Sequence, residues 1–271
     1  MNVYIWGALI FKNSHLFPQT FANHTPITPF IVLSITESTN NYAMAKLHAG
    51  MVEHPTCFFA IEQTQGRGQR GKQWLSNPGD NITMSTAFDA STGISANVAA
   101  FPFVISAAMA LGCYDFIKDC GLPDVSIKWP NDIYVGDRKA AGILIENVYR
   151  GSNLGCSVAG TGININQESF PSAAGKAVSF KMITGTHYNT VKLGKSLFRF
   201  LVSRFLVLKD ASARSVMDEY NACLYQKGRS VKFKKGNILF SATINNVSES
   251  GELNVTGATD QTFNVGEVEF V

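Results

Sequence analysis

Disulfide and metal-binding patterns are missing from the 271-residue chain. Its five cysteines include no C-x-x-C pair, and an odd number of scattered cysteines argues against a disulfide framework or a zinc site. The five histidines form no H-E-x-x-H pattern. We therefore expect reduced thiols, as in a cytosolic protein, and no tightly bound metal.

Long apolar runs are missing too. The opening segment, MNVYIWGALIF, is apolar but too short to span a bilayer, and it has neither a basic start nor a cleavage pattern after it. We interpret residues 1–29 as an N-terminal extension, a tail or an edge strand, and we expect a soluble, cytoplasmic protein with no membrane partner. The net charge of +3 is too small to indicate nucleic-acid binding over the whole surface.

Between residues 30 and 225 the pattern of apolar residues predicts strands joined as hairpins and interrupted by helices. The predicted strands cover 30–35, 56–62, 81–88, 125–129, 133–136, 140–149 and 155–165. The predicted helices cover 39–48, capped by Ser38 or Thr39 and stopped at Gly50, then one long helix over 95–121 with Pro102 in its first turns, then 191–208 and 212–224. This order predicts an α+β fold with a mixed, largely antiparallel sheet and flanking helices.

Residues 226–271 change to short strands separated by Gly, Asn and Ser turns, a pattern typical of a small SH3-like β-barrel. Basic residues cluster here: Lys227, Arg229, Lys232, Lys234 and Lys235. The cluster fits a nucleic acid, an acidic carrier domain or ATP phosphates. We favour a solvated strand face, with Val231 and Phe233 inward and the lysines outward.

A basic, glycine-rich loop, QTQGRGQRGKQW, follows the strand at 56–62, and no acidic residue lies between Glu62 and Asp80. The loop joins two strands, so it is not the strand-to-helix fingerprint of a dinucleotide fold, and it lacks the G-K-[ST] ending of a P-loop. Glycines allow backbone N–H groups to approach an anion, and arginine binds phosphate or carboxylate with forked geometry. Taken alone, the loop indicates either an anion site or a solvated turn.

Three further segments carry residues of the same kind. KWPND places Lys128 in a strand beside an Asn-Asp pair that suits a phosphate and a magnesium ion, although a hairpin turn explains the pattern equally well. DRKAAGILIE places Lys139 before an apolar strand, where a turn lysine in water is also common. GTGININ either ends a strand in a bulge or brings backbone close to a ligand.

In this order, the segments ESTN, GRGQRGKQW, KWPNDIYV, KAAGILIE and GTGIN resemble the motifs of the biotin protein ligase family. The resemblance covers residues 30–271. It implies a catalytic domain like that of class II aminoacyl-tRNA synthetases at 30–225, followed by the barrel at 226–271. Such enzymes, the biotin–[acetyl-CoA-carboxylase] ligases, join biotin and Mg-ATP into biotinyl-5′-AMP and then transfer biotin to one lysine of a biotin carboxyl carrier domain.

The resemblance also implies a role for each motif residue. Lys139 would lie between the biotin carboxylate and the α-phosphate, with Arg67 and Arg70 as the other catalytic cations. The positions implied to bind biotin are Ser38, Thr39, Asn40, Gln63, Gly66, Arg67, Gly68, Gln69, Lys139, Gly142, Gly160 and Gly162. Those implied to bind ATP are Arg70, Lys72, Trp74, Lys128, Asn131, Asp132, Lys139 and Asn164, with Trp74 near the adenine and Asp132 facing the magnesium ion. Because biotinyl-AMP hydrolyses easily, the loop should order over it and exclude water.

The chain departs from the family pattern in two places. Gln69 stands where many members have an arginine, so we expect weaker retention of the adenylate than in those members. Only residues 1–29 precede the catalytic domain, too few for the helix-turn-helix module with which some members repress biotin genes. We therefore expect a ligase alone, without DNA binding.

Two other functions remain open on the sequence. Lipoate ligases and octanoyl transferases share the fold, but they carry a different glycine-rich signature with a histidine that this chain lacks. A non-enzymatic, biotin-sensing regulator would bind nucleic acid through the basic loops, and salt-dependent DNA binding would support it. Family members are monomers or dimers, so a homodimer is compatible with the sequence.

Overall fold

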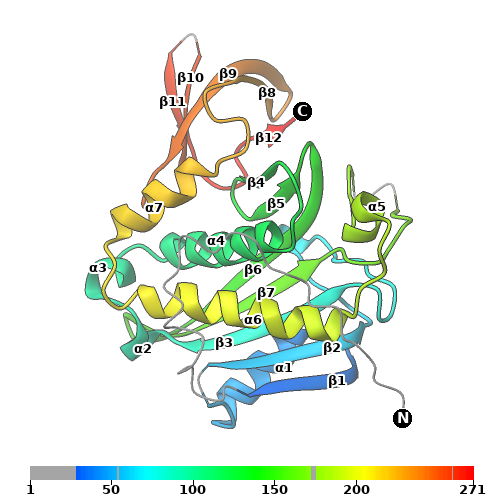
Figure 1. Cartoon of the computed structure of the whole chain (residues 1–271). Helices are drawn as coiled ribbons and strands as arrows, with labels where there is room; N and C mark the ends of the chain where they lie inside the picture. Colours follow the sequence, from blue (N-terminus) through cyan, green and yellow to red (C-terminus); the bar gives the residue numbers. More distant parts are fainter. Residues whose placement is uncertain (1–28, 54, 172–174, 258) are drawn as a thin grey trace.

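The computed structural model describes residues 29–53, 55–171, 175–257 and 259–271. Apart from Pro29, the predicted N-terminal tail or edge strand lies outside the described residues. The described chain forms a large sheet with helices on both faces and a smaller C-terminal sheet, drawn at the top of Figure 1.

The larger sheet is mixed, with one parallel pair of strands. In spatial order its strands are β1 (Phe30–Thr36), β2 (Thr56–Gln63), β3 (Ile82–Asp89), β7 (Asn153–Ile163), β6 (Arg138–Arg150), β5 (Asp132–Val135) and β4 (Val125–Lys128). β1 and β2 are parallel because helix α1 (Thr39–His48) returns the chain between them, and all other neighbours are antiparallel. The predicted α+β fold with a mixed, largely antiparallel sheet is confirmed.

Helices cover the two faces of this sheet unequally. Helices α4 (Phe103–Asp119) and α6 (Thr190–Val207) lie side by side across one face and form the main core with it (Figure 1). On the other face α1 packs against a small apolar cluster that includes Phe58 and Val158. Side chains alternate along a strand, so Phe59 joins the main core while its neighbour Phe58 faces α1. Because α1 lies over β2, β3 and β7, it does not cover β6 and β5, and other residues can occupy that part of the same face.

The prediction of one long helix over residues 95–121 was wrong. The segment forms two helices, α3 (Ala96–Ala99) and α4, and the Ser95 hydroxyl caps α3 by accepting from the Val98 N–H. Pro102 occupies the N-cap of α4. Proline has no N–H to continue a helix and disfavours helical geometry in the residue before it, so the chain breaks at this point.

The remaining helices divide by length. α1, α6 and α7 (Ala213–Ala222) begin and end within one turn of their predicted bounds, and Ser38 is the N-cap of α1. The short helices α2 (Ala90–Gly93) and α5 (Phe180–Thr184) were not predicted, because a single turn leaves no periodic pattern in the sequence.

The C-terminal sheet is antiparallel throughout. Its strands, in spatial order, are β11 (Asp260–Phe263), β10 (Leu253–Thr256), β9 (Ile238–Val247), β8 (Ser230–Lys235) and β12 (Glu269–Phe270). Phe233 is buried and the flanking Lys232 and Lys234 are exposed, as the alternating pattern predicted. The sheet is attached to the rest of the molecule by hydrogen bonds, including one of 2.9 Å from the Trp129 indole to the Gly251 carbonyl.

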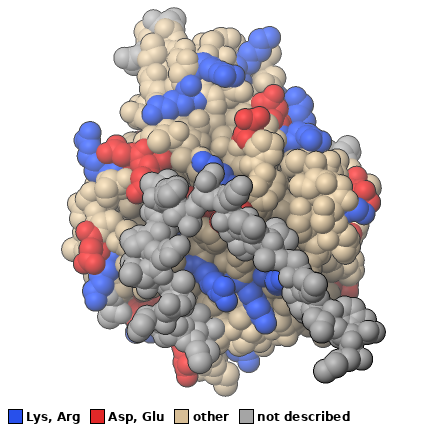
Figure 2. All heavy atoms as spheres, in the orientation of Figure 1, with Lys and Arg blue, Asp and Glu red and all other residues tan. Residues whose placement is uncertain are grey.

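Charged side chains of both signs are interspersed over the face of the molecule shown in Figure 2, and blue basic side chains also surround the C-terminal sheet at the top. Outside the grey atoms, this face shows no single continuous basic patch. Among the helices of the described residues, none combines the length and the apolar character needed to cross a membrane.

Candidate active site

A cavity of about 720 Å³ opens on the α1 face of the sheet, next to the N-terminus of α1. Its walls come from the start of α1, the β2–β3 loop, strands β5, β6 and β7, and the segment before β12. Of the residues predicted to bind biotin or ATP, all line this cavity except Gly66. Gly66 is buried in the β2–β3 loop, where an added Cβ would overlap the Trp74 carbonyl.

The floor of the cavity is made of glycines on neighbouring strands. Gly160 and Gly162 point to the same face as Val158, since residues two apart on a strand share a face, and Gly142 pairs with Gly162 across β6. A Cβ at Gly160 would overlap the Asn40 amide, and a Cβ at Gly162 would overlap the Trp74 ring. These glycines therefore admit the Asn40 and Trp74 side chains onto the sheet, whereas the close approach to a ligand that GTGIN suggested stays a prediction.

The basic β2–β3 loop folds over the cavity as a narrow hairpin, which we call the flap (residues 64–74). The Gly68 N–H donates to the Lys72 carbonyl at 2.7 Å, and the Trp74 N–H donates to the Gly66 carbonyl at 2.9 Å. A 3₁₀ turn, η2 (Gln69–Gly71), forms its tip, with Arg70 in the left-handed region at φ 56°. The segment is therefore a hairpin that lines one side of the cavity while much of it stays exposed to solvent.

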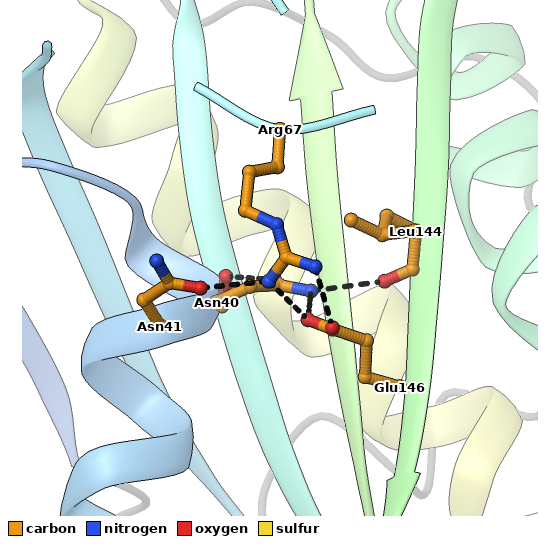
Figure 3. Close-up of polar contacts among 6 residues, drawn as sticks. Asn40, Asn41, Arg67, Leu144 and Glu146 are labelled. Carbon is orange, nitrogen blue, oxygen red and sulfur yellow. Dashed lines mark hydrogen bonds and ion pairs between the residues drawn. The ribbon is translucent and has the colours of Figure 1, made fainter. Parts of the chain in front are cut away.

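The two arginines of the flap have different partners. The Arg67 guanidinium donates to both carboxylate oxygens of Glu146, at 2.9 and 3.2 Å, and to the Asn41 side chain at 2.7 Å (Figure 3). The Arg70 guanidinium lies against Gly266, in the segment before β12, so closely that a Cβ there would overlap it. Arg67 is thus held by the protein itself, whereas Arg70 reaches the C-terminal sheet.

One end of the cavity is strongly basic. Lys72, Lys128, Lys139 and Lys176 all line it, and the Lys139 ammonium forms an ion pair of 2.6 Å with Asp132. Lys176 was not predicted; the Lys139 N–H bonds to its carbonyl at 2.7 Å, a contact between distant parts of the chain that leaves no sequence pattern. Four cations around one space suit a polyanion such as a triphosphate.

Among these lysines, Lys128 is the one whose pKa is clearly shifted by its surroundings. Burial lowers its pKa, and the neighbouring Lys139, Lys176 and Lys72 lower it further, while Asp132 opposes the shift. Its ammonium donates to the Tyr134 hydroxyl at 3.1 Å and lies 4.7 Å from the centre of the Phe270 ring. β12 of the C-terminal sheet therefore supplies one wall of the basic end.

The other end of the cavity, at the start of α1, is polar and without lysines. The Gln63 side-chain oxygen accepts from the Thr39 N–H and hydroxyl at 2.8 and 3.0 Å. The Ser85 hydroxyl, which was not predicted, lies within hydrogen-bond distance of the Thr39 hydroxyl, at 2.7 Å, and of the Asn40 amide oxygen, which accepts its proton. Ser85 lies in the middle of β3, and no sequence motif surrounds it that would mark a binding site. It comes to lie under α1 only because β3 pairs with its neighbours in the sheet.

Three predicted ATP-side residues have specific surroundings. The Asn131 amide donates to the Ile143 carbonyl at 2.6 Å, and the Asn164 amide donates to the Lys139 carbonyl at 3.3 Å, so both hold the backbone around Lys139. The Trp74 indole lies over Gly162 with Lys139 at 5.8 Å from its ring centre. Its N–H is buried and has no partner among the described residues.

Carboxylates are few around the cavity. Asp132 and Glu269 line it, and the described part of the chain contains no group of three His, Cys, Asp or Glu side chains that could hold a metal ion by itself. This donor set suits magnesium that arrives with a nucleotide, because Mg²⁺ is usually bound through one or two carboxylates and the substrate's phosphates.

Residues 32–164 match the biotin/lipoate A/B protein ligase family. This domain belongs to that family. The matching segment contains the flap, both lysine motifs and the glycine floor. A bifunctional ligase/repressor BirA from Escherichia coli is 34% identical over 49% of the chain and 40% of that protein. A biotin–[acetyl-CoA-carboxylase] ligase from Paracoccus denitrificans is 37% identical over 52% of the chain and 56% of that protein. The matches thus span about half of the length of these relatives.

Solved structures of biotin protein ligases share the fold over most of the chain. The Aquifex aeolicus biotin protein ligase in complex with biotin and ATP superposes with a TM-score of 0.72 at 22% identity, covering 90% of this chain and 98% of that one. The Helicobacter pylori biotin acetyl coenzyme A carboxylase synthetase gives a TM-score of 0.57 at 21% identity, covering 87% and 99%. At these identities the likeness establishes the fold.

Proposed function

We propose that the protein is a biotin–protein ligase, which converts biotin and ATP to biotinyl-5′-AMP and transfers biotin to a lysine of a biotin carboxyl carrier domain. One observation carries the proposal: a single cavity joins a neutral polar end at α1 to four lysines, with the flap over it. Biotin has a neutral ureido ring at one end and a carboxylate at the other. The two ends of the cavity suit these two groups, with the triphosphate beyond the carboxylate.

In the first step, a biotin carboxylate oxygen attacks the α-phosphorus of ATP, and the bond from that phosphorus to pyrophosphate breaks. Both reactants are anions, so fixed cations are needed to bring them together and to stabilise the charge that develops. We assign this role to Lys139, with Lys128, Lys72 and Arg70 on the phosphate side. Asp132 keeps Lys139 in place until the anions arrive.

In the second step, the amine of the carrier lysine attacks the carbonyl of the mixed anhydride, an amide forms and AMP leaves. Water competes with that amine for the same carbonyl. The flap, whose tip lines the cavity, is positioned to exclude water while the adenylate waits.

Magnesium would accompany ATP, with Asp132 as its protein ligand, and it would reduce the charge of the triphosphate. We also propose that the C-terminal sheet is the SH3-like module of these ligases, because five antiparallel strands follow the catalytic sheet and provide Phe270 and Gly266 to the cavity. The carrier domain would approach on this side.

The first test is the Lys139→Ala protein supplied with biotin and Mg-ATP. We expect its rate of biotinyl-AMP formation, measured by pyrophosphate release, to fall by about 10²–10³-fold, the usual effect of removing one preorganised charge from an active site. Lys181→Ala is the matched control, because Lys181 pairs with Glu168 at 2.6 Å and does not line the cavity. If the unmodified protein formed no biotinyl-AMP, the proposal would be wrong.

The family also contains lipoate ligases, so the acid must be tested directly. Lipoate has no ureido group to fill the hydrogen bonds of Thr39, Asn40 and Gln63. Calorimetry should therefore show clear binding of biotin and much weaker binding of lipoate. Tighter binding of lipoate would assign the protein to the other branch of the family.

A further inference from the structure

Glu146 of β6 joins the flap to the polar end of the cavity. Its carboxylate accepts two hydrogen bonds from Arg67, and one oxygen also accepts from the Asn40 amide at 2.9 Å (Figure 3). Arg67 belongs to the flap, whereas Asn40 lies in the first turn of α1 and is buried. One half-buried carboxylate thus contacts two parts of the site that come from different loops of the chain.

Glu146 makes the shorter of the two hydrogen bonds that set which way the Asn40 amide faces; the Leu144 carbonyl accepts the other. A carboxylate can only accept hydrogen bonds, so the NH₂ group of Asn40 must face Glu146. Its amide oxygen then faces the opposite way, where it accepts from the Ser85 hydroxyl. With a neutral partner at position 146, only the longer contact of 3.4 Å with the Leu144 carbonyl would hold Asn40 in this orientation.

This orientation leaves the polar end with spare acceptors. Three oxygen-to-oxygen contacts connect Asn40, Ser85, Thr39 and Gln63 in a chain. The hydroxyls of Ser85 and Thr39 supply one proton each, and the Gln63 oxygen also accepts from the Thr39 N–H, so the chain needs no proton from outside. The amide oxygens of Asn40 and Gln63 each keep a second lone pair, which is available to a ligand N–H. If Asn40 were turned over, its NH₂ group would face Ser85 and the preference for a donor would weaken.

We propose that Glu146 is a positioning residue that fixes this acceptor-rich polarity for the ureido N–H groups of biotin and, through Arg67, anchors the flap. That the ligand is biotin rests on the proposed function. The anchoring of the flap is independent of that function, because it needs no ligand. Arg67 then acts on the flap and not directly on the biotin carboxylate, the role that the sequence resemblance implied for it.

The test compares Glu146→Gln, which keeps the shape of the side chain, with Arg67→Met, which removes the flap's contacts with Glu146 and Asn41 but keeps the bond between Glu146 and Asn40. Two readouts separate the roles: the Kd of biotin by calorimetry without ATP, and the rate of tryptic cleavage after Arg70 in the native protein. We expect Glu146→Gln to weaken biotin binding about tenfold, as for loss of one charge-assisted hydrogen bond, and to speed cleavage. Arg67→Met should speed cleavage equally and leave the biotin Kd within about twofold.

An exchange of partners provides a further check. In Asn40→Asp two carboxylates face each other, whereas the double variant Asn40→Asp, Glu146→Gln restores an amide–carboxylate hydrogen bond and keeps an acceptor toward Ser85. The double variant should bind biotin more tightly than Asn40→Asp alone, while equal affinities would show that the contact does not set the polarity. Thermal melting of each variant confirms that it folds.

Three outcomes would overturn the proposal: an unchanged biotin Kd in Glu146→Gln, unchanged cleavage in both single variants, or an Arg67→Met protein that loses as much biotin affinity as Glu146→Gln. In the last case the arginine itself would contact the ligand. If the unmodified protein bound no biotin, the proposed function would fail, and the cleavage rates, which need no ligand, would still decide the anchoring role.

Discussion

Lys128 shows how neighbours control the charge of a single residue. Its ammonium lies near the rings of Tyr134, Tyr225 and Phe270, at 4.8, 5.9 and 4.7 Å from their centres, and three other lysines share the same space. The rings attract the cation, but burial and the other lysines favour the neutral amine. A bound phosphate would favour the charged form again.

The lowered pKa of Lys128 predicts that the KM for ATP depends on pH. Because the pKa of Lys128 is lowered, the ammonium loses its proton at a lower pH than an exposed lysine does, and phosphate binding is lost with it. The KM for ATP should therefore rise as pH increases from about 7 to about 10, below the ordinary lysine pKa of about 10.4. In Lys128→Arg the charge persists and the rise should be smaller. Steady-state kinetics would show this, with Lys181→Arg as the control; equal pH profiles in all three proteins would contradict it.

Gln69 is the second residue whose effect can be isolated. It lines the cavity at the tip of the flap, so Gln69→Arg adds a cation next to the proposed adenylate. One added charge-assisted hydrogen bond, worth about 1.5 kcal/mol, would slow the release of biotinyl-AMP about tenfold. Gln65→Arg is the control, because Gln65 is exposed at the base of the flap and does not line the cavity. Equal release rates in the unmodified protein and the Gln69→Arg variant would contradict this prediction.

At the scale of elements, β7 carries the two glycines that lie under the two ends of the cavity, the ends we propose for biotin and for ATP. Gly160 and Gly162 lie two residues apart on the same face, yet the first admits Asn40 and the second admits Trp74. The same one-carbon change at these positions therefore disturbs different ends of the cavity.

The two glycine-to-alanine variants should consequently show opposite selectivity. Gly160→Ala displaces the Asn40 amide and should raise the KM for biotin at least tenfold, with a smaller effect on ATP. Gly162→Ala displaces the Trp74 ring and should raise the KM for ATP more than that for biotin. The magnitude follows from shifts forced on packed neighbours, typically about 1–3 kcal/mol. Initial rates at varied biotin and ATP would test the pair, and parallel changes in both variants would contradict the division.

Much of the element structure was predictable from local patterns, but the partners of each strand were not. The motif residues were predicted to meet, and all of them except Gly66 line one cavity. Ser85, Glu146 and Lys176 were not singled out, because a serine, a glutamate and a lysine in ordinary sequence surroundings gain a role only when sheet order places them beside α1, the flap or Lys139. The helix breaks at Pro102 because proline restricts the backbone of the residue before it, and the spacing of apolar residues carries no information about that restriction.

For the whole molecule, the main connection is between the C-terminal sheet and the flap. Gly266 has φ 91° and an added Cβ would overlap the Arg70 guanidinium. The C-terminal segment therefore limits where the Arg70 guanidinium can lie, and a change far along the chain reaches the basic end of the cavity.

We expect Gly266→Ala to move Arg70 and to raise the KM for ATP several-fold, with the biotin Kd little changed. Gly236→Ala is a well-matched control: this glycine of the same sheet also has a positive φ, 58°, but nothing lies within 4 Å of an added Cβ. Gly236→Ala shows the effect of an alanine at positive φ without a steric contact, and only Gly266→Ala should affect ATP. Equal KM values for ATP would show that the contact between Gly266 and Arg70 has no effect on the site.

The buried, unpartnered N–H of the Trp74 indole has an optical consequence. Trp129, the other tryptophan of the described residues, is 4% exposed, and its indole N–H already has a partner in the Gly251 carbonyl. A nucleotide entering beside Trp74 would offer that N–H an acceptor and alter the polarity around the ring. Intrinsic fluorescence should therefore report occupancy of the cavity in real time, without a label and without a coupled assay.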